Sequence, residues 1–238
     1  MFSDDEEKIR DAYNICDTWP EYDAWHQYTH AFIDTHVNSF LKKYASPDSI
    51  ILNAGSGDTH YNCLGTVFDC DIAENKLIYS NHAIHASITS LPCKEQSFDI
   101  CICVGSVLNY TDAALAISEI ARVLKSGGKA IIEFERSLSA EFLFTSDYGK
   151  DCFRNKYLYG NKEHSLWLYS ECYIDTLLQA HNLHIIKKTR FHTTSSLVSR
   201  LLHDDNKAAP WAKVDKFIKP LSYLFAHNSI YIIDHTMD

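Results

Sequence analysis

The stretch Ile51-Leu-Asn-Ala-Gly-Ser-Gly57 carries the strongest local signal for the fold of this chain. The apolar run Ser49–Asn53 stops at two closely spaced glycines, which predicts a strand that ends in a glycine turn. Glycine lets the backbone bend sharply there and lets a ligand come within van der Waals contact. On its own, this pattern also fits an ordinary turn between a strand and a helix.

An acidic residue at the end of the next predicted strand, Thr66–Asp71, strengthens the interpretation as a binding site. In open α/β sheets, an acid at this position accepts hydrogen bonds from the hydroxyls of a ribose. Asp71 fits this role better than its neighbour Asp69, because Asp71 stands at the turn from strand to helix. The alternative for Asp71 is a helix N-cap.

Hydrophobic periodicity extends the pattern along the chain. Residues 5–44 are expected to be helical, with a break at Trp19-Pro20, because a proline disfavours helix at the preceding residue. Ser126-Gly127-Gly128 should end the predicted helix 112–124. Residues 137–168 are expected to be less regular. The further predicted strands are 84–88, 98–104, 129–135, 183–191 and 229–235, and the further helices are 112–124 and 170–181.

Strands that alternate with helices predict a doubly wound α/β fold with a mostly parallel sheet. We expect one domain, divided into a helical cap (1–46), a cofactor-binding core (47–136) and an acceptor-side half (137–238) with an insertion at 195–227.

Composition excludes several classes of protein. The formal net charge of −9 and the lack of a basic stripe argue against a nucleic-acid partner. The N-terminus has no apolar core of a signal peptide, and no apolar run reaches the length of a transmembrane helix. None of the eight cysteines forms a CxxC pair, and no cluster has metal-ligand spacing. We therefore expect a cytoplasmic protein with no metal and no membrane partner.

Five segments, in order and spacing, resemble the class I S-adenosylmethionine-dependent methyltransferases, in particular methyltransferase type 11 and the quinone-biosynthesis C-methyltransferases. These segments are Ile51–Gly57, Phe68–Leu77, Ser90–Pro92, Gln96–Asp112 and Ile120–Lys129. The resemblance implies a Rossmann-like, seven-stranded sheet and S-adenosyl-L-methionine as cofactor.

The resemblance also implies roles for single residues. Gly55, Ser56 and Gly57 would lie under the methionine part of the cofactor, and Asp71 would hold its ribose. Further along the chain, residues 72 and 87–88 would surround the adenine, 105–106 would line the sulfonium end, and 110 would border the acceptor pocket. By name these residues are Ile72, Ser87, Ile88, Gly105, Ser106 and Tyr110.

Three positions depart from the pattern of the family. Asn53 stands where the family usually has an acid, Ser87 lacks the carboxylate that usually faces the adenine, and Thr59 replaces the third glycine. A protein that binds the cofactor without turnover therefore remains an alternative. A nicotinamide-dependent oxidoreductase is a weaker one, because His60 occupies the last glycine position of the dinucleotide fingerprint.

The acceptor is expected to enter at the carboxyl ends of the strands. There, Arg136 could hold a carboxylate with its planar guanidinium, and Arg190 and His192 follow at the end of a later strand. The alternative is that these side chains face solvent and pair with acids, Arg136 with Glu133 or Glu135. We expect O-methylation of a small-molecule or peptide carboxylate or hydroxyl, with N- or C-methylation as alternatives.

Overall fold

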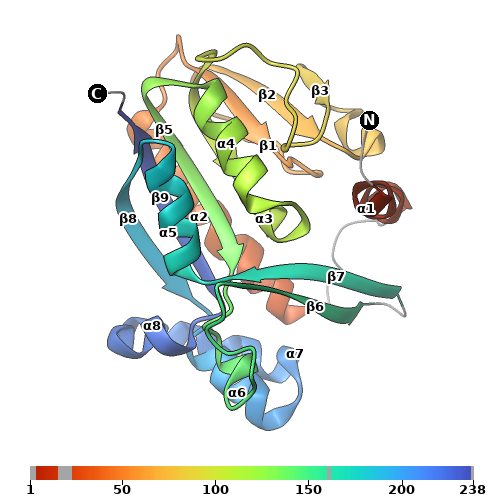
Figure 1. The fold of residues 1–238 in the computed structure, drawn as a ribbon, viewed down its shortest axis with the longest axis vertical. Coiled ribbons are helices and arrows are strands. Elements are labelled where there is room, and N and C mark those ends of the chain that lie inside the picture. The colour runs from red at the N-terminus through yellow and green to blue at the C-terminus, as the bar shows by residue number, and fades with distance from the viewer. Residues whose placement is uncertain (1–3, 16–22, 160–161, 237–238) are drawn as a thin grey trace.

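A single seven-stranded sheet forms the centre of the computed structural model, which describes residues 4–15, 23–159 and 162–236. Its strands follow the order β3-β2-β1-β4-β5-β9-β8, and only β9 runs antiparallel to its neighbours. The expected doubly wound, mostly parallel, Rossmann-like sheet is therefore confirmed (Figure 1). The strands are β1 (Ile50–Ala54), β2 (Thr66–Asp71), β3 (Ala83–His85), β4 (Phe98–Cys103), β5 (Leu124–Glu135), β8 (Leu183–Phe191) and β9 (Asn228–His235).

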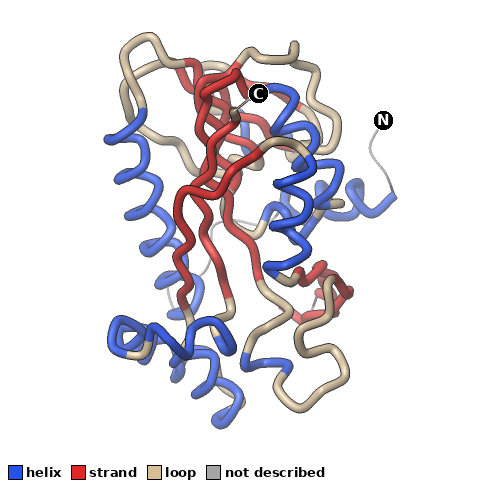
Figure 2. Tube along the Cα trace, turned by 60° about the vertical axis from the view of Figure 1, so that its left-hand side comes forward, coloured by secondary structure: helices blue, strands red, loops and turns tan. Residues whose placement is uncertain are grey.

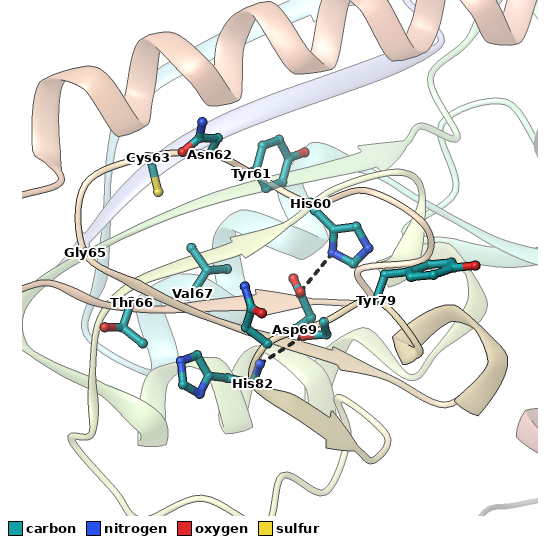
Figure 3. Close-up of a pocket in the computed structure, with 12 residues that line it drawn as sticks. His60, Tyr61, Asn62, Cys63, Gly65, Thr66, Val67, Asp69, Tyr79 and His82 are labelled. Atoms are coloured by element: carbon teal, nitrogen blue, oxygen red, sulfur yellow. Dashed lines mark hydrogen bonds and ion pairs between the residues drawn. The ribbon is translucent and has the colours of Figure 1, made fainter.

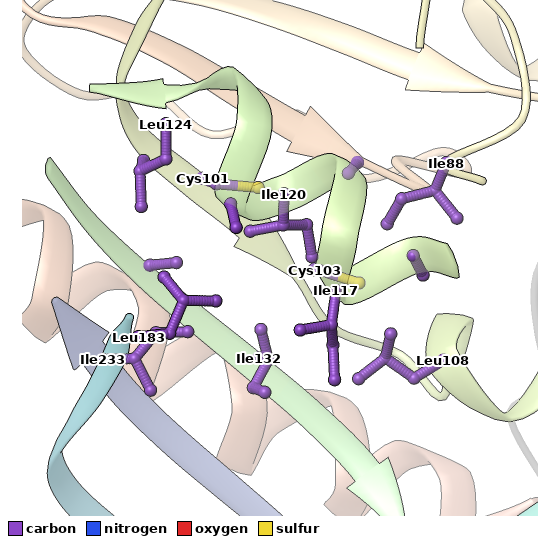
Figure 4. Packing of buried hydrophobic residues seen from close by; sticks show 14 of the residues in the cluster. Ile88, Cys101, Cys103, Leu108, Ile117, Ile120, Leu124, Ile132, Leu183 and Ile233 are labelled. Carbon is purple, nitrogen blue, oxygen red and sulfur yellow. The ribbon is translucent and has the colours of Figure 1, made fainter. Parts of the chain in front are cut away.

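Helices cover both faces of the sheet (Figures 1 and 2). Successive side chains of a strand point to opposite faces, so each inner strand needs apolar residues throughout. Leu52 and Ile132 face α4 (Ala113–Val123) and α5 (Glu171–Ala180), where Ile117 and Ile120 pack as Figure 4 shows. Ile51 and Ile131 belong instead to the cluster around Val37, Phe40 and their neighbours on α2 (Ala24–Tyr44).

This arrangement differs from the expected helical cap over residues 1–46, because α2 is a layer of the core. Of the two described helices within residues 1–46, it is α1 (Asp4–Ile15) that lies toward the carboxyl edge of the sheet. There, Tyr13 packs edge-on against Tyr110, and Asn14 accepts a hydrogen bond from the amide of Asn75. The expected break at Trp19-Pro20 lies outside the described residues.

The glycine pair at 127–128 was expected to end a helix, but it does not. The helix α4 already ends at Val123, and Leu124 begins β5. Gly127 has a φ of +78°, and a Cβ on Gly128 would lie 2.8 Å from the carbonyl oxygen of Lys125. The pair therefore makes a tight bend within β5, where the register with β4 shifts.

The stretch 137–168 is more regular than predicted. It contains the short helix η2 (Ala140–Phe142) and most of a separate antiparallel hairpin, β6 (Cys152–Tyr159) and β7 (Lys162–Tyr169). Phe153 opposes Leu168 across this hairpin, and the two belong to a small apolar cluster with Phe142. Residues 152–157 do not alternate between apolar and polar side chains, so the sequence carries no periodic signal for this strand.

The insertion at 195–227 is helical and lies beyond the carboxyl end of β5 (Figure 1). It comprises α6 (Thr194–Leu202), α7 (Asp205–Ala208), η3 (Ala209–Phe217), η4 (Lys219–Leu221) and α8 (Ser222–Phe225). The short helices η1 (Glu74–Leu77) and α3 (Val107–Tyr110) follow β2 and β4.

Candidate functional site

The turn after β1 has the geometry that its glycines predict. Gly55 and Gly57 have φ angles of +71° and +50°, a region that glycine occupies without strain. The amides of Gly55 and Ser56 donate to the carbonyl oxygen of Cys70, at 2.7 and 3.0 Å. A Cβ on Gly55 would lie 2.3 Å from Val107, whereas a Cβ on Gly57 would meet no atom within 4 Å. The turn is therefore held by Cys70 and packed against Val107 at Gly55, and it is open at Gly57.

Asp71 holds this turn through two charge-assisted hydrogen bonds. Its Oδ2 accepts from the amide of Gly57, and its Oδ1 accepts from the amide of Ala73, each at 2.8 Å. Burial raises the pKa of Asp71, although both amides favour the ionised form. The carboxylate thus joins the end of β2 to the turn after β1.

Asp69, the rival for this role, is engaged elsewhere. It is buried, and its two oxygens contact Asn53 Nδ2 at 2.9 Å and His60 Nδ1 at 3.0 Å. The amide of Asn53 also donates to the carbonyl oxygen of Thr59. Asn53 therefore serves as a donor that neutralises the buried polarity of Asp69 and ties down the chain after the glycine turn.

Ser87 and Ile88, after β3, are buried side by side, and Ile72 lies at the end of β2. The carboxylate of Glu6 on α1 accepts hydrogen bonds from the hydroxyls of Ser87 and Thr89. A carboxylate is therefore present beside Ser87 after all, but it comes from a distant part of the chain. No signal in the acidic N-terminal sequence singles out Glu6 for this contact.

Gly105 and Ser106 follow β4 with φ angles of +81° and +59°. Such a φ is uncommon for serine and often marks a functional site. Their amides donate to Glu133 Oε2 at 3.0 and 2.7 Å, and burial raises the pKa of Glu133 to about 7. A Cβ on Gly105 would meet no atom within 4 Å, so the backbone is open on this side as well.

A second acidic residue of β5 continues this polar network toward η2. Glu135 Oε1 accepts from the hydroxyl of Ser106 at 2.9 Å, and Glu135 Oε2 lies 3.5 Å from His227 Nε2. His227 Nδ1 lies 3.5 Å from Glu141 Oε2, to which the hydroxyl of Tyr157 donates at 3.4 Å. We refer to Glu135, Glu141, Tyr157 and His227 as the acid–histidine cluster.

The pKa values of the three charged groups in the acid–histidine cluster are shifted in different directions. Burial lowers the pKa of His227, but the two carboxylates outweigh burial and raise it to about 9. Burial raises the pKa of Glu135, but His227 and Ser106 outweigh it, so the pKa is lowered. The pKa of Glu141 is raised by burial, which His227 only partly offsets. Glu141 is also the most exposed of the three, at 37% of its side chain against 15% for Glu135 and 11% for His227.

The expected cationic mouth around Arg136 is wrong. Arg136 is fully buried, and its guanidinium donates to the carbonyl oxygens of Ser222, Tyr223 and Ala226 at 2.7–3.1 Å. Its Nε lies 3.1 Å from Glu171, not beside Glu133 or Glu135. Arg190 donates twice to the same carboxylate at 2.6 Å. Both guanidinium groups are therefore engaged within the protein.

His192 is also unsuited to the role expected of it. It is fully buried and stacks on Trp25 with a centroid distance of 3.8 Å. Its ring nitrogens contact Thr29 Oγ1 at 2.9 Å and Ser195 Oγ at 2.7 Å. Burial, with some help from His227, lowers the pKa of His192, so it stays neutral. Tyr110, by contrast, lies between Tyr13 of α1 and the apolar cluster of the hairpin.

One hollow of about 280 Å³ lies away from the glycine turn, over β2 (Figure 3). His60, Asp69 and His82 are among the residues that line it, with the exposed ring of Tyr79 at its rim. Within the described ranges, no group of histidine, cysteine and acidic side chains is arranged to hold a metal ion. No helix there is long and apolar enough to cross a bilayer.

Comparisons with known proteins agree with this geometry. Residues 52–132 match a protein family described as a methyltransferase domain. No curated protein sequence matches the chain. Among solved structures, the chain is similar to a geranyl diphosphate C-methyltransferase from Streptomyces coelicolor A3(2), with 12% identity, a TM-score of 0.62, and coverage of 98% of this chain and 99% of that one.

Two further structures have the same fold. The 1,6-didemethyltoxoflavin-N1-methyltransferase of Burkholderia thailandensis shares 13% identity at a TM-score of 0.57, with 98% of this chain and 87% of that one covered. The [4+2]-cyclase SpnF shares 13% identity at a TM-score of 0.56, with 85% and 81% covered. At such low identity the likeness to these structures shows the fold alone.

The family match includes β1, β2, β4 and the first part of β5, which carry the glycine turn, Asp71 and Gly105. The family match over residues 52–132 and the shared fold support the class I S-adenosylmethionine-dependent methyltransferase family, which the five sequence segments predicted. S-adenosylmethionine is the methyl donor of this family.

Proposed function

We propose that this protein transfers a methyl group from S-adenosylmethionine to a hydroxyl or amine of a small molecule. The observation that carries the proposal is the open backbone at Gly57 and Gly105, with Asp71 beside the first, at the carboxyl edge of a methyltransferase domain. Ligands of open α/β sheets bind at this edge.

The residues at this edge fit the cofactor. The hydroxyl of Ser56 is buried and has no hydrogen-bond partner in the described structure, so it is available to a ligand above the turn. Gly55, Ser56 and Gly57 would hold the methionine part, Asp71 and Ile72 the ribose and adenine, and Gly105 and Ser106 the sulfonium end. Ser87 and Ile88 would border the adenine, with Glu6 as the nearby carboxylate. The cofactor supplies an electrophilic methyl group on a positively charged sulfur.

The acceptor end of the site is proposed to be the acid–histidine cluster with Tyr110. Ser106 connects the two ends, because its amide binds Glu133 and its hydroxyl binds Glu135. A hydroxyl or an amine must lose a proton when it takes up a methyl group, and a positioned carboxylate can accept that proton. Glu141 is suited to this step because its raised pKa makes it a better base than an ordinary carboxylate, and because it is accessible.

The contacts of Arg136, Arg190 and His192 do not support a carboxylate as the methyl acceptor. Arg136 and Arg190 both bind Glu171, and His192 is buried and neutral, so these groups offer no cationic mouth. The acid–histidine cluster would instead repel an anion, since two carboxylates surround one imidazole. C-methylation stays an alternative when the acceptor carbon has an acidic proton.

Calorimetry with S-adenosylhomocysteine tests the cofactor part of the proposal. We expect binding in the micromolar range, and Asp71→Ala should weaken it by about 1.5–3 kcal/mol, the usual value of a charge-assisted hydrogen bond. Asp48→Ala is a matched control, because Asp48 is exposed and precedes the amino end of β1, whereas the site lies at the carboxyl end of that strand. Absence of binding by S-adenosylhomocysteine, together with binding of NAD, would overturn the proposal in favour of an oxidoreductase.

A further inference from the structure

The helical insertion exposes an unusual amount of apolar surface. Seven of the fourteen large hydrophobic side chains that stand exposed in the described structure lie within residues 201–224. They are Leu201, Leu202, Trp211, Phe217, Leu221, Tyr223 and Leu224. Scattered single apolar residues are normal on a surface, whereas apolar side chains gathered on one face mark an interaction site.

The geometry of η3 sorts its side chains into three stripes. A 3₁₀-helix has three residues per turn, so side chains three positions apart lie above one another. Ala209 and Ala212 form the inward stripe, together with Asp215, which accepts hydrogen bonds from the amides of Thr193 and Thr194. The apolar stripe and the basic stripe share the rest of the helix surface.

The apolar stripe consists of Trp211, Val214 and Phe217, and Phe217 is 75% exposed. The basic stripe consists of Lys213 and Lys216, and Lys219 continues their spacing into η4. All three lysines are exposed, and Lys216 Nζ lies 5.0 Å from the centroid of the Phe217 ring, within reach of a cation–π contact.

Nearby acids do not neutralise this basic stripe. Asp215 points inward to the start of α6, and Asp204 pairs with Lys207 at 2.9 Å. In the described part of the chain, no acidic side chain forms an ion pair with Lys213, Lys216 or Lys219. A local positive charge thus stands beside bulky apolar side chains, on a protein whose formal net charge is −9.

We propose that this surface, formed by η3, η4 and α8, docks onto an anionic lipid membrane. Large apolar side chains next to lysines are the features of helices that lie in a bilayer interface, where the rings enter the headgroup region and the lysines meet anionic lipids. This departs from the expectation of no membrane partner that the sequence alone suggested.

A second copy of the chain is a less suitable occupant of this surface. A two-fold interface brings the same patch of both subunits together, so it would gather the lysines of both copies into one interface. The surface is also fixed to the catalytic domain, because Arg136 at the end of β5 donates to the carbonyl oxygens of Ser222, Tyr223 and Ala226. Docking would therefore hold the carboxyl edge of the sheet close to the membrane (Figure 1).

Vesicle co-sedimentation of the full chain tests the proposal. Vesicles of phosphatidylcholine with about 30% phosphatidylserine should bind the protein at least roughly ten-fold more strongly than pure phosphatidylcholine, and added salt should weaken binding. The triple variant Lys213→Glu, Lys216→Glu, Lys219→Glu should lose this binding. The double variant Trp211→Ala, Phe217→Ala should also bind roughly ten-fold less, because the apolar contribution is removed.

Matched controls separate docking from general effects of charge and hydrophobicity. Lys42→Glu with Lys43→Glu reverses exposed lysines of α2, and Ile78→Ala with Tyr79→Ala removes exposed apolar side chains elsewhere. Both should bind vesicles as the wild type does. All variants should keep the circular dichroism spectrum of the wild type.

Three outcomes would overturn the proposal. One is equal or absent binding of the wild type to the two kinds of vesicle. Another is loss of binding in the α2 control as large as in the triple variant. The third is a wild-type dimer in light scattering without lipid that the triple variant abolishes, which would assign the surface to self-association. None of these readouts depends on cofactor binding or methyl transfer.

Discussion

Two ionic networks lie near the carboxyl end of β5, and they differ in how completely their charges are used. Around Glu171, two arginines and the hydroxyl of Ser229 surround one carboxylate, and Arg136 donates further to three carbonyl oxygens. Around His227, two carboxylates share one imidazole at longer distances of 3.5 Å, and Glu141 is partly exposed. The contacts of the first network are 2.6–3.1 Å long, shorter than those between His227 and its two carboxylates.

This difference distinguishes a structural network from the proposed acceptor site at one edge of the sheet. Positively charged residues at a strand end suggested an anion site, but a buried guanidinium must satisfy its donors within the protein. The Glu171 network does so and fastens α8 and β8 to the end of β5. The charged groups of the acid–histidine cluster lie 3.5 Å apart and have shifted pKa values, a feature that functional sites often share.

Removal of Arg136 should have the largest effect of all. Arg136→Met would leave three carbonyl oxygens without their donor and remove one counter-charge of the buried Glu171, so we expect a loss of about 3–5 kcal/mol in the free energy of unfolding. Urea denaturation followed by circular dichroism measures it. Arg200→Met, at an exposed position of α6, is the control and should change stability by less than about 0.5 kcal/mol. Equal effects of the two variants would contradict the assigned role of Arg136.

The second-largest effect should come from low pH, which should weaken the Glu171 network. Burial raises the pKa of Glu171, but the hydrogen bonds from Arg190 and the charge of Arg136 outweigh it and lower the pKa to about 2 from an ordinary 4.5. A carboxyl group with a depressed pKa stabilises the fold above its unfolded pKa, and this stabilisation is lost as the pH falls from about 4.5 to about 2. We expect Glu171 to contribute about 3 kcal/mol to this loss.

Urea titrations at pH 6, 4 and 3 measure the acid effect. In Glu171→Gln the slope of stability against pH in this window should be shallower than in the wild type. Glu95→Gln, which removes an exposed carboxylate, should keep the slope of the wild type. An unchanged slope in Glu171→Gln would show that other carboxylates cause the acid sensitivity.

A substitution in the acid–histidine cluster should lower activity much more than it lowers stability. Glu141→Gln should change stability by less than about 1 kcal/mol, because its side chain is partly exposed and its contacts are long. With a hydroxyl or amine acceptor, kcat should fall roughly 100-fold, since a positioned proton acceptor is lost. Release of S-adenosylhomocysteine measures kcat, and Glu95→Gln again provides the control. A large loss of stability with unchanged kcat would place Glu141 in the structural class of Glu171.

The sequence by itself determined the core of the fold and the backbone turns that form the proposed cofactor half of the site. Apolar runs of five to seven residues, glycines after the first strand and an acid after the second are local features, and each fixes a local backbone geometry. Their order along the chain then predicts a parallel sheet, because strands that alternate with helices have few other arrangements. The strands β2 and β8 were predicted with the bounds that the structure has.

Only the tertiary structure decided the acceptor half. Glu141 and His227 come from segments far apart in the sequence, and no local pattern distinguishes them from other acids and histidines. The same holds for Glu6 beside the proposed adenine pocket. Whether Arg136 faces a ligand or Glu171 depends on where α5 and α8 pack, which is a property of long-range contacts. A charge acquires its role from the groups that surround it in space, and the sequence around one residue does not specify that surrounding.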